Sequence, residues 1–282
     1  MTQPHATEAN FDEILQYLCE PDGQEQAALE SVRVGDEQTV RQTSLGLKEG
    51  ASLRNKLEAV TLRKPDILQI LLEENRVLSE DVVAEAFQRK DRMCIRILLD
   101  FGWDINNTLW AASPLCFAIH DKDFMNWLID HGADINARYE LDLPVLASAI
   151  ALGDIQVVHL LLEKGADVMH GNLLHSAVER KNQREGAELV DFLARKGVDV
   201  NAHRHTNSVA WKQKAMSFLP TPLYLACDKE NIPVVQALLQ HGADPARKVF
   251  VWGRNGPSAL ERTRSINNPK LSALLFGAPS KF

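Results

Sequence analysis

Two histidines separated by a single residue, His203 and His205, could supply two nitrogen ligands to a metal ion. A metal site needs further ligands, and no third side chain of the right type follows at a matching spacing. We therefore expect no metal site here and interpret the pair as part of a solvent-exposed loop.

A histidine beside a carboxylate indicates a second kind of chemistry, general acid–base catalysis. The candidates are His120, Glu179 and Asp228, which would need to share one groove covered by a segment that carries His203 or His205. The chain contains no G-x-S-x-G, H-E-x-x-H or G-x-G-x-x-G motif and no phosphate-binding loop of the nucleotide hydrolases. No recognised motif supports catalysis, and we expect no cofactor.

A short recurring stretch indicates how the chain is built. Apolar helical patterns are followed five times by a glycine and a similar closing sequence, as in HGADIN and KGVDVN. These glycines are Gly102, Gly132, Gly165, Gly197 and Gly242, separated by 30, 33, 32 and 45 residues. Glycine directly after a helix favours a left-handed C-terminal cap. A period near 33 predicts a stack of small helical units rather than one globular core.

A shorter helix is expected upstream of each glycine. The clearest one reads TPLYLAC, where Thr221 is a suitable N-cap and Pro222 lies in the first turn. The pattern resembles the ankyrin repeat, whose signature T-P-L-H-x-A-A is followed by a helix and then by G-A-D-x-N. In the stretch NLLHSA, which resembles that signature, His175 stands at the position of its histidine. The resemblance implies an all-α solenoid of stacked helix–turn–helix repeats with projecting finger loops.

The resemblance covers roughly residues 24–276, with about six to eight units, and it is clearest at 81–246. Residues 1–23 are expected to form an N-terminal capping helix, and residues 277–282 a C-terminal tail. One finger, residues 202–220, carries a long insertion. Insertions of this length in a compact repeat are often functional.

Aromatic and basic residues in the fingers indicate a binding surface. A merely tolerated loop would be polar and poor in aromatic residues, whereas tryptophan and tyrosine are enriched in binding hot spots. We predict that a partner contacts residues of the fingers and of the inner surface that the fingers and short helices form. These residues are Trp110, Phe117, Tyr139, Arg180, Arg204, Trp211, Lys212, Phe218 and Trp252.

The same alignment to the ankyrin pattern separates the acid–base candidates. His120, Glu179 and Asp228 fall on the inner surface but in different repeats, and neighbouring helix layers lie about 10 Å apart. His120 and Asp228 are three repeats apart, so direct contact between them is not expected. The alternative left open is a cofactor-independent enzyme for proton transfer or cyclisation, or a ligand carrier, with residues 202–220 as a lid.

Charge and composition restrict the partners. The net charge of −7 argues against broad nucleic-acid binding, and no secretory or membrane-spanning run is visible. The four cysteines form no C-x-x-C motif, which indicates free thiols in a reducing compartment. The last three residues, Ser280-Lys281-Phe282, are a loose variant of a peroxisomal address. We expect a monomeric intracellular adaptor or regulatory subunit, cytoplasmic or nuclear, for a protein of unknown identity; a small-molecule ligand remains open.

Overall fold

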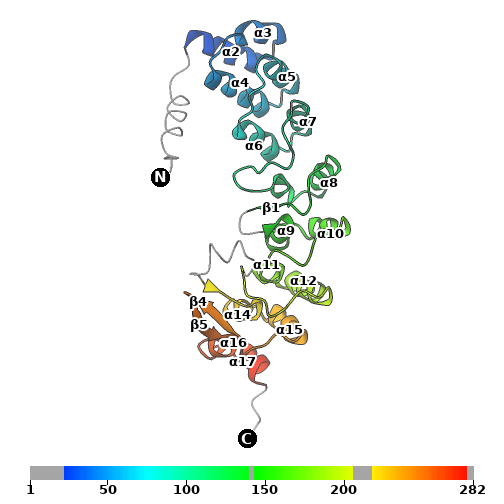
Figure 1. The fold of residues 1–282 in the computed structure, drawn as a ribbon, viewed down its shortest axis with the longest axis vertical. Coiled ribbons are helices and arrows are strands. Elements are labelled where there is room, and N and C mark those ends of the chain that lie inside the picture. Colours follow the sequence, from blue (N-terminus) through cyan, green and yellow to red (C-terminus); the bar gives the residue numbers. More distant parts are fainter. Residues whose placement is uncertain (1–21, 140–142, 206–217, 278–282) are drawn as a thin grey trace, which may run out of the picture. The chain divides into compact units, whose positions relative to one another are not determined.

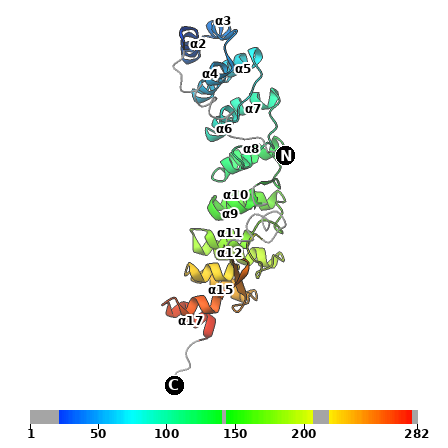
Figure 2. The same ribbon diagram turned by 60° about the vertical axis from the view of Figure 1, so that its left-hand side comes forward.

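The computed structural model describes residues 22–139, 143–205 and 218–277, which are mostly helical (Figure 1 and Figure 2). The chain divides into two compact units, Met1–Trp110 (unit 1) and Ala111–Phe282 (unit 2). The expected N-terminal capping helix and C-terminal tail lie almost wholly outside the described residues. None of the helices in the described ranges combines the length and hydropathy that a membrane span requires.

The boundary between the two units is marked by an unusual backbone conformation. It falls between Trp110 and Ala111, two consecutive residues with φ of 50° and 62°. Positive φ is uncommon for residues other than glycine. The regular course of the chain is therefore interrupted at the point where one unit ends.

The described residues of unit 1 form three helix pairs. They are α2 (Gly23–Val34) with α3 (Glu37–Ser44), α4 (Glu49–Thr61) with α5 (Pro65–Glu74), and α6 (Glu80–Gln88) with α7 (Arg92–Asp100). The first helices of successive pairs pack on one another, and so do the second helices. Leu68, Leu71 and Leu98 are among the large side chains fully buried between these two rows. This is the stacked arrangement that the 33-residue period predicts.

Unit 2 has the same plan, with five helix pairs among the residues that the structure describes. They are the 3-10 helix η1 (Pro114–Ala118) with α8 (Lys122–Asp130), α9 (Val145–Leu152) with α10 (Ile155–Glu163), α11 (Leu173–Glu179) with α12 (Gln183–Arg195), α14 (Pro222–Asp228) with α15 (Ile232–Gln240), and α16 (Ala259–Arg264) with α17 (Pro269–Phe276). The short helices η1, α9, α11, α14 and α16 form one row. The predicted helical solenoid is confirmed.

The helix ends have the chemistry expected from the sequence. The Thr221 hydroxyl accepts a hydrogen bond from the backbone N–H of Tyr224 at 3.2 Å, and Pro222 is the first residue of α14. The five closing glycines all have positive φ, between 81° and 100°. Helix capping by these residues is therefore confirmed, because only glycine adopts this backbone without strain.

The fingers contain short strands that the sequence did not predict. One hairpin joins β1 (Arg138–Tyr139) to β2 (Leu143–Pro144), and a three-stranded antiparallel sheet has the order β3 (Phe218–Leu219), β4 (Lys248–Val251), β5 (Arg254–Ser258). We call this second sheet the finger sheet. Its strands lie beside the row of short helices in the lower part of Figure 1.

Several titratable groups lie inside the helical layers. In unit 1 the Lys56 side chain is fully buried, and its ammonium donates to the Val77 carbonyl at 2.7 Å. Burial lowers the pKa of Lys56 to about 8, although Glu49 opposes the change. The three cysteines in the described part of the chain carry free thiols. Burial raises the pKa of Cys94 in unit 1 to about 12 and that of Cys227 in unit 2 to about 11.

Candidate functional site

The long insertion is closed at its base by hydrogen bonds. The Arg204 N–H donates to the Pro220 carbonyl at 3.0 Å, and Nε2 of the buried His175 also lies 3.0 Å from this oxygen. Asn172 accepts from the His205 N–H at 2.9 Å through its side-chain oxygen. We call Arg204, His205 and Pro220 the neck. These contacts fix the two ends between which residues 206–217, outside the described structure, are inserted.

The neck is also tied to the neighbouring elements. The Arg204 guanidinium forms an ion pair with Glu179 of α11, with Nη1 and Oε1 2.6 Å apart. Nε2 of His203 donates to the Lys248 carbonyl of β4 at 2.7 Å, and its ring centroid lies 4.7 Å from that of Phe250. Arg204 and His203 therefore hold the start of the insertion against α11 and the finger sheet.

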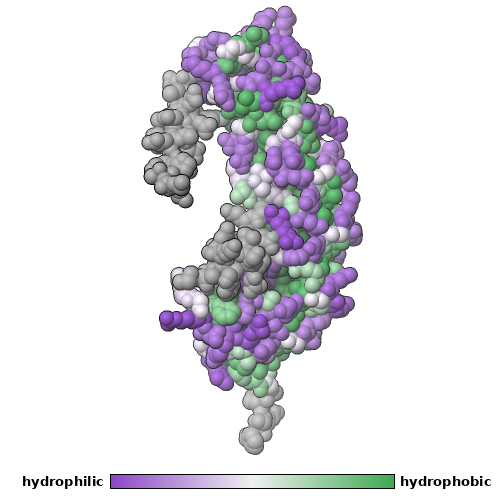
Figure 3. All heavy atoms as spheres, viewed as in Figure 1, coloured by the Kyte–Doolittle hydropathy of each residue, from purple (hydrophilic) through white to green (hydrophobic). Residues whose placement is uncertain are grey.

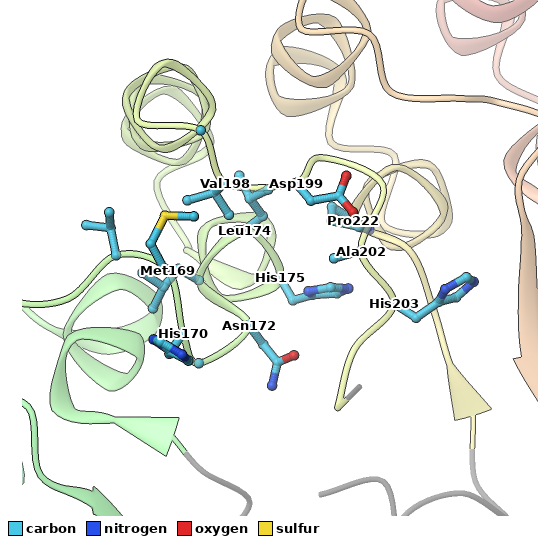
Figure 4. A pocket seen from close by; sticks show the side chains of 14 residues that line it. Met169, His170, Asn172, Leu174, His175, Val198, Asp199, Ala202, His203 and Pro222 are labelled. Atoms are coloured by element: carbon cyan, nitrogen blue, oxygen red, sulfur yellow. The ribbon is translucent and has the colours of Figure 1, made fainter. Parts of the chain in front are cut away.

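A cavity of about 350 Å³ lies beside the neck (Figure 4). Its walls are the loop from Val168 to Asn172, the first turns of α11 and α14, and the loop from Gly197 to His203. Burial lowers the pKa of His175, one of the lining residues, to about 3. The imidazole is therefore neutral at pH 7 and can donate only through one nitrogen, which the Pro220 carbonyl occupies. The lining combines apolar side chains with polar groups that already have structural partners.

The outer surface of the finger sheet is set by its register. Phe218 pairs with Val251, and Val251 pairs with Arg254, so these three side chains project from the same face. Leu219 and Phe250 belong to the opposite face, where Leu219 is buried. Phe218 is 44% exposed. An aromatic, an aliphatic and a cationic side chain thus form one row across three strands.

Trp252 lies at the tip of the finger sheet, in the two-residue turn between β4 and β5. Trp252 and Gly253 have φ of 52° and 74°, and hairpin turns with two positive φ values favour asparagine or glycine. The tryptophan is nevertheless 68% exposed. In the space-filling view, hydrophobic and hydrophilic residues lie side by side where Figure 1 labels β4 and β5 (Figure 3). Burial therefore does little to offset the strained backbone of Trp252.

The acid–base candidates are not brought together. The side chain of His120 lies 3.5 Å from Asp154, that of Glu179 pairs with Arg204, and that of Asp228 pairs with Arg262 at 2.6 Å. His203 and His205 contribute to the neck and to its contact with β4. Each group has a structural partner, and the geometry shows no shared acid–base centre. Within the described ranges, no three His, Cys, Asp or Glu side chains are close enough to hold a metal ion.

The remaining predicted binding residues have different environments. Trp110 in unit 1 is more than half exposed, and its backbone N–H donates to the Glu80 carboxylate. Phe117, in η1, is half-buried. Arg180 is only 8% exposed, which corrects the expectation that it faces the inner groove. Its guanidinium donates to the carbonyls of Ala149 and Ile150 and pairs with Glu185; the preceding repeat therefore covers it.

Three of the predicted binding positions cannot be placed in this geometry. The side chain of Tyr139, and the whole of Trp211 and Lys212, lie outside the described residues. Their roles stay predictions.

Sequence reasoning missed three exposed residues of unit 2. Arg247 and Arg254 flank the strand β4 and its turn, and Met169 lines the cavity. A signal for Met169 is present in the sequence, since it stands where the closing stretches HGADIN and KGVDVN have asparagine. A signal for the arginines is their position beside an aromatic run in a predicted finger.

Comparisons with known proteins agree with this architecture. Residues 146–249 match the family model of ankyrin repeats in three copies. The crystal structure of the human ASB11 ankyrin repeat domain superposes with a TM-score of 0.54 at 22% identity, over 80% of this chain and 99% of that domain. At this identity the structural match supports the fold alone.

Curated relatives also carry ankyrin repeats in their names. A Fowlpox virus (strain NVSL) protein is 25% identical over 167 residues, covering 58% of this chain and 36% of the relative. A protein of Treponema pallidum (strain Nichols) is 24% identical over 190 residues, covering 67% of this chain and 57% of the relative. The chain thus spans about a third of the first and just over half of the second. The repeat motifs, the stacked helix pairs and these matches together show that residues 146–249 match ankyrin repeats and that the helix pairs have the fold of an ankyrin repeat domain.

Proposed function

We propose that this protein is an intracellular adaptor or regulatory subunit that binds a partner protein through the finger sheet of unit 2. Ankyrin repeats are generally protein–protein interaction modules. The proposal adds the location of the contact, which centres on Trp252 and Phe218.

The observation that carries the proposal is the conformation and exposure of Trp252. A left-handed backbone costs a residue other than glycine or asparagine about 1 kcal/mol or more. A tryptophan normally offsets such a cost by burying its large ring, but this ring is 68% exposed. A partner that covers the ring would supply the missing burial, and tryptophan is enriched among residues that dominate binding energy.

The finger sheet is held in place by contacts of residues other than Trp252. β4 is paired on both sides by β3 and β5, and the His203 imidazole bonds to its Lys248 carbonyl. Ser258 and Glu261 form a capping box at the start of α16, directly after β5. A surface that is already ordered before contact loses little conformational entropy on binding.

The proposal is tested by affinity capture from a native lysate with the full chain and with a Trp252→Ala variant. We expect at least one protein to be recovered only with the unchanged chain. Direct titration of that protein should show a dissociation constant raised about fivefold or more by the substitution, the range of hot-spot residues.

Leu152→Ala is the matched control, because Leu152 is 70% exposed at the end of α9 and lies outside the finger sheet. This variant should bind the partner as the unchanged chain does. Equal affinity of the Trp252→Ala variant for every captured protein would refute the role of the finger sheet.

A further inference from the structure

The charge of the segment that contains β4, β5 and α16 differs from that of the chain as a whole. The segment from Arg247 to Arg264 contains five basic residues and one acidic residue, Glu261, whereas the net charge of the chain is −7. The basic residues are Arg247, Lys248, Arg254, Arg262 and Arg264. The finger sheet and the adjoining helix α16 therefore form a local basic region on an acidic protein, and a surface of this kind attracts acidic partners.

Internal contacts already use three of these cations. Lys248 pairs with Glu261, Arg262 pairs with Asp228 at 2.6 Å, and Arg264 lies over the Phe276 ring at 5.4 Å. Arg247 and Arg254 are exposed and form no ion pair with any described residue. Their guanidinium groups are the ones that the fold leaves for an external carboxylate.

Arg254 occupies a defined place beside apolar side chains. It ends the row that runs from Phe218 through Val251, and it follows the Trp252–Gly253 turn. We infer that the finger sheet recognises an acidic peptide segment of a partner, with a carboxylate at Arg254 and an apolar side chain against Phe218 and Trp252. Carboxylate and guanidinium pair in a planar, two-point geometry. The inference rests on the proposed function and adds the chemistry of the partner.

The surroundings favour a peptide over a nucleic acid. A phosphate backbone needs several cations in series, but only Arg247 and Arg254 are available here, about 13 Å apart along the direction of β4 at the usual rise per residue. The nearby carboxylates of Asp228 and Glu261 would repel further phosphates, and the whole chain is acidic. One carboxylate beside an apolar side chain fits this pattern of charges.

The experiment selects binders from a library of random short peptides displayed on phage, with the full chain as target. Enriched peptides are synthesised and titrated at low salt against the unchanged chain and against Arg254→Glu, Trp252→Ala and Lys122→Glu variants. Lys122 is an exposed cation at the start of α8, so its reversal is matched in charge but distant in the fold. Circular dichroism and melting temperature confirm that each variant is folded.

We expect the enriched peptides to be acidic and to carry an apolar residue. Arg254→Glu should weaken their binding about tenfold or more, Trp252→Ala should do so as well, and Lys122→Glu should have little effect. Peptides without an excess of acidic residues, or peptides lost with Trp252→Ala but retained with Arg254→Glu, would overturn the inference and leave the proposed function standing.

Two other outcomes are also decisive. Peptides that bind the Trp252→Ala and Arg254→Glu variants unchanged, or a selection that enriches none, would overturn both the inference and the finger sheet as a contact site. Binding of a single-stranded oligothymidylate probe that depends on Arg254 would overturn the peptide in favour of a nucleic acid.

Discussion

Lys56 makes the stability of unit 1 depend on pH in a direction that can be calculated. Its side chain is 0% exposed, and burial lowers its pKa from 10.5 to about 8. At pH 7 the lysine is charged in both states, and the folded state bears the full desolvation penalty. As pH rises from 8 to 10.5, the folded unit releases the proton while the unfolded chain keeps it. Stability therefore rises with pH in this window.

The size of the effect follows from these two pKa values. Between pH 7 and pH 9 the linkage relation gives a gain of about 1.3 kcal/mol in the free energy of unfolding of unit 1. A Lys56→Met variant has a side chain of similar length and no proton to release, so this gain should disappear. The raised pKa values of Cys94 and Cys227 act in the opposite direction near pH 9, but they are common to both proteins and cancel in the comparison.

The buried thiols provide an assay that reports each unit separately. A short alkylation pulse during a urea titration, followed by mass spectrometry, gives the unfolding midpoint at Cys94 in unit 1 and at Cys227 in unit 2. Between pH 7 and pH 9, the Cys94 midpoint of the unchanged chain should rise relative to that of Lys56→Met by roughly 1 M urea. The Cys227 midpoint should not differ between the two proteins. An equal pH dependence at Cys94 would refute the lowered pKa of Lys56.

Two further substitutions test the backbone geometry of unit 2. Trp252→Asn should be about 1 kcal/mol more stable than Trp252→Ala, because both remove the ring but asparagine tolerates the left-handed conformation; identical urea midpoints would contradict strain at this turn. Gly171 has φ of 91°, and a Cβ there would lie 2.2 Å from Cδ of Pro144, so Gly171→Ala should cost about 2 to 4 kcal/mol by thermal or urea unfolding. Gly165→Ala is its control, with φ of 89° but open space around the added Cβ, and it should cost only about 1 kcal/mol; equal losses would show that the contact with Pro144 relaxes.

The parts of the fold that depend on residues close together in the sequence could be predicted from the sequence. A helix end needs a capping residue within one turn of the chain. Thr221 therefore indicates the start of α14, and Gly197 indicates the end of α12. The recurrence of these signals at a near-constant spacing then predicts the stack. None of these inferences requires knowledge of contacts between distant segments.

The features that sequence reasoning missed depend on groups far apart in the chain. The guanidinium of Arg180 is buried because carbonyls about thirty residues earlier, at Ala149 and Ile150, accept its hydrogen bonds. The finger sheet pairs Phe218 with Val251 across more than thirty residues, which no local pattern encodes. The hairpin turn at Trp252 was missed for a different reason. Its first residue is a tryptophan, whereas asparagine at this position would have been a recognisable sequence signal for a hairpin.

The neck has a consequence for how this protein can change over evolutionary time. Arg204 and Pro220 are joined by a backbone hydrogen bond, and His175 and Asn172 hold this junction from the helical layer. Because both ends are fixed, a longer flexible connection between them costs only about 0.6 kcal/mol more in loop-closure free energy for each doubling of its length. An insertion or deletion between these two ends can therefore leave the hydrogen bonds of the neck in place. The neck therefore allows the sequence between its two ends to vary over evolutionary time while the repeat scaffold stays the same.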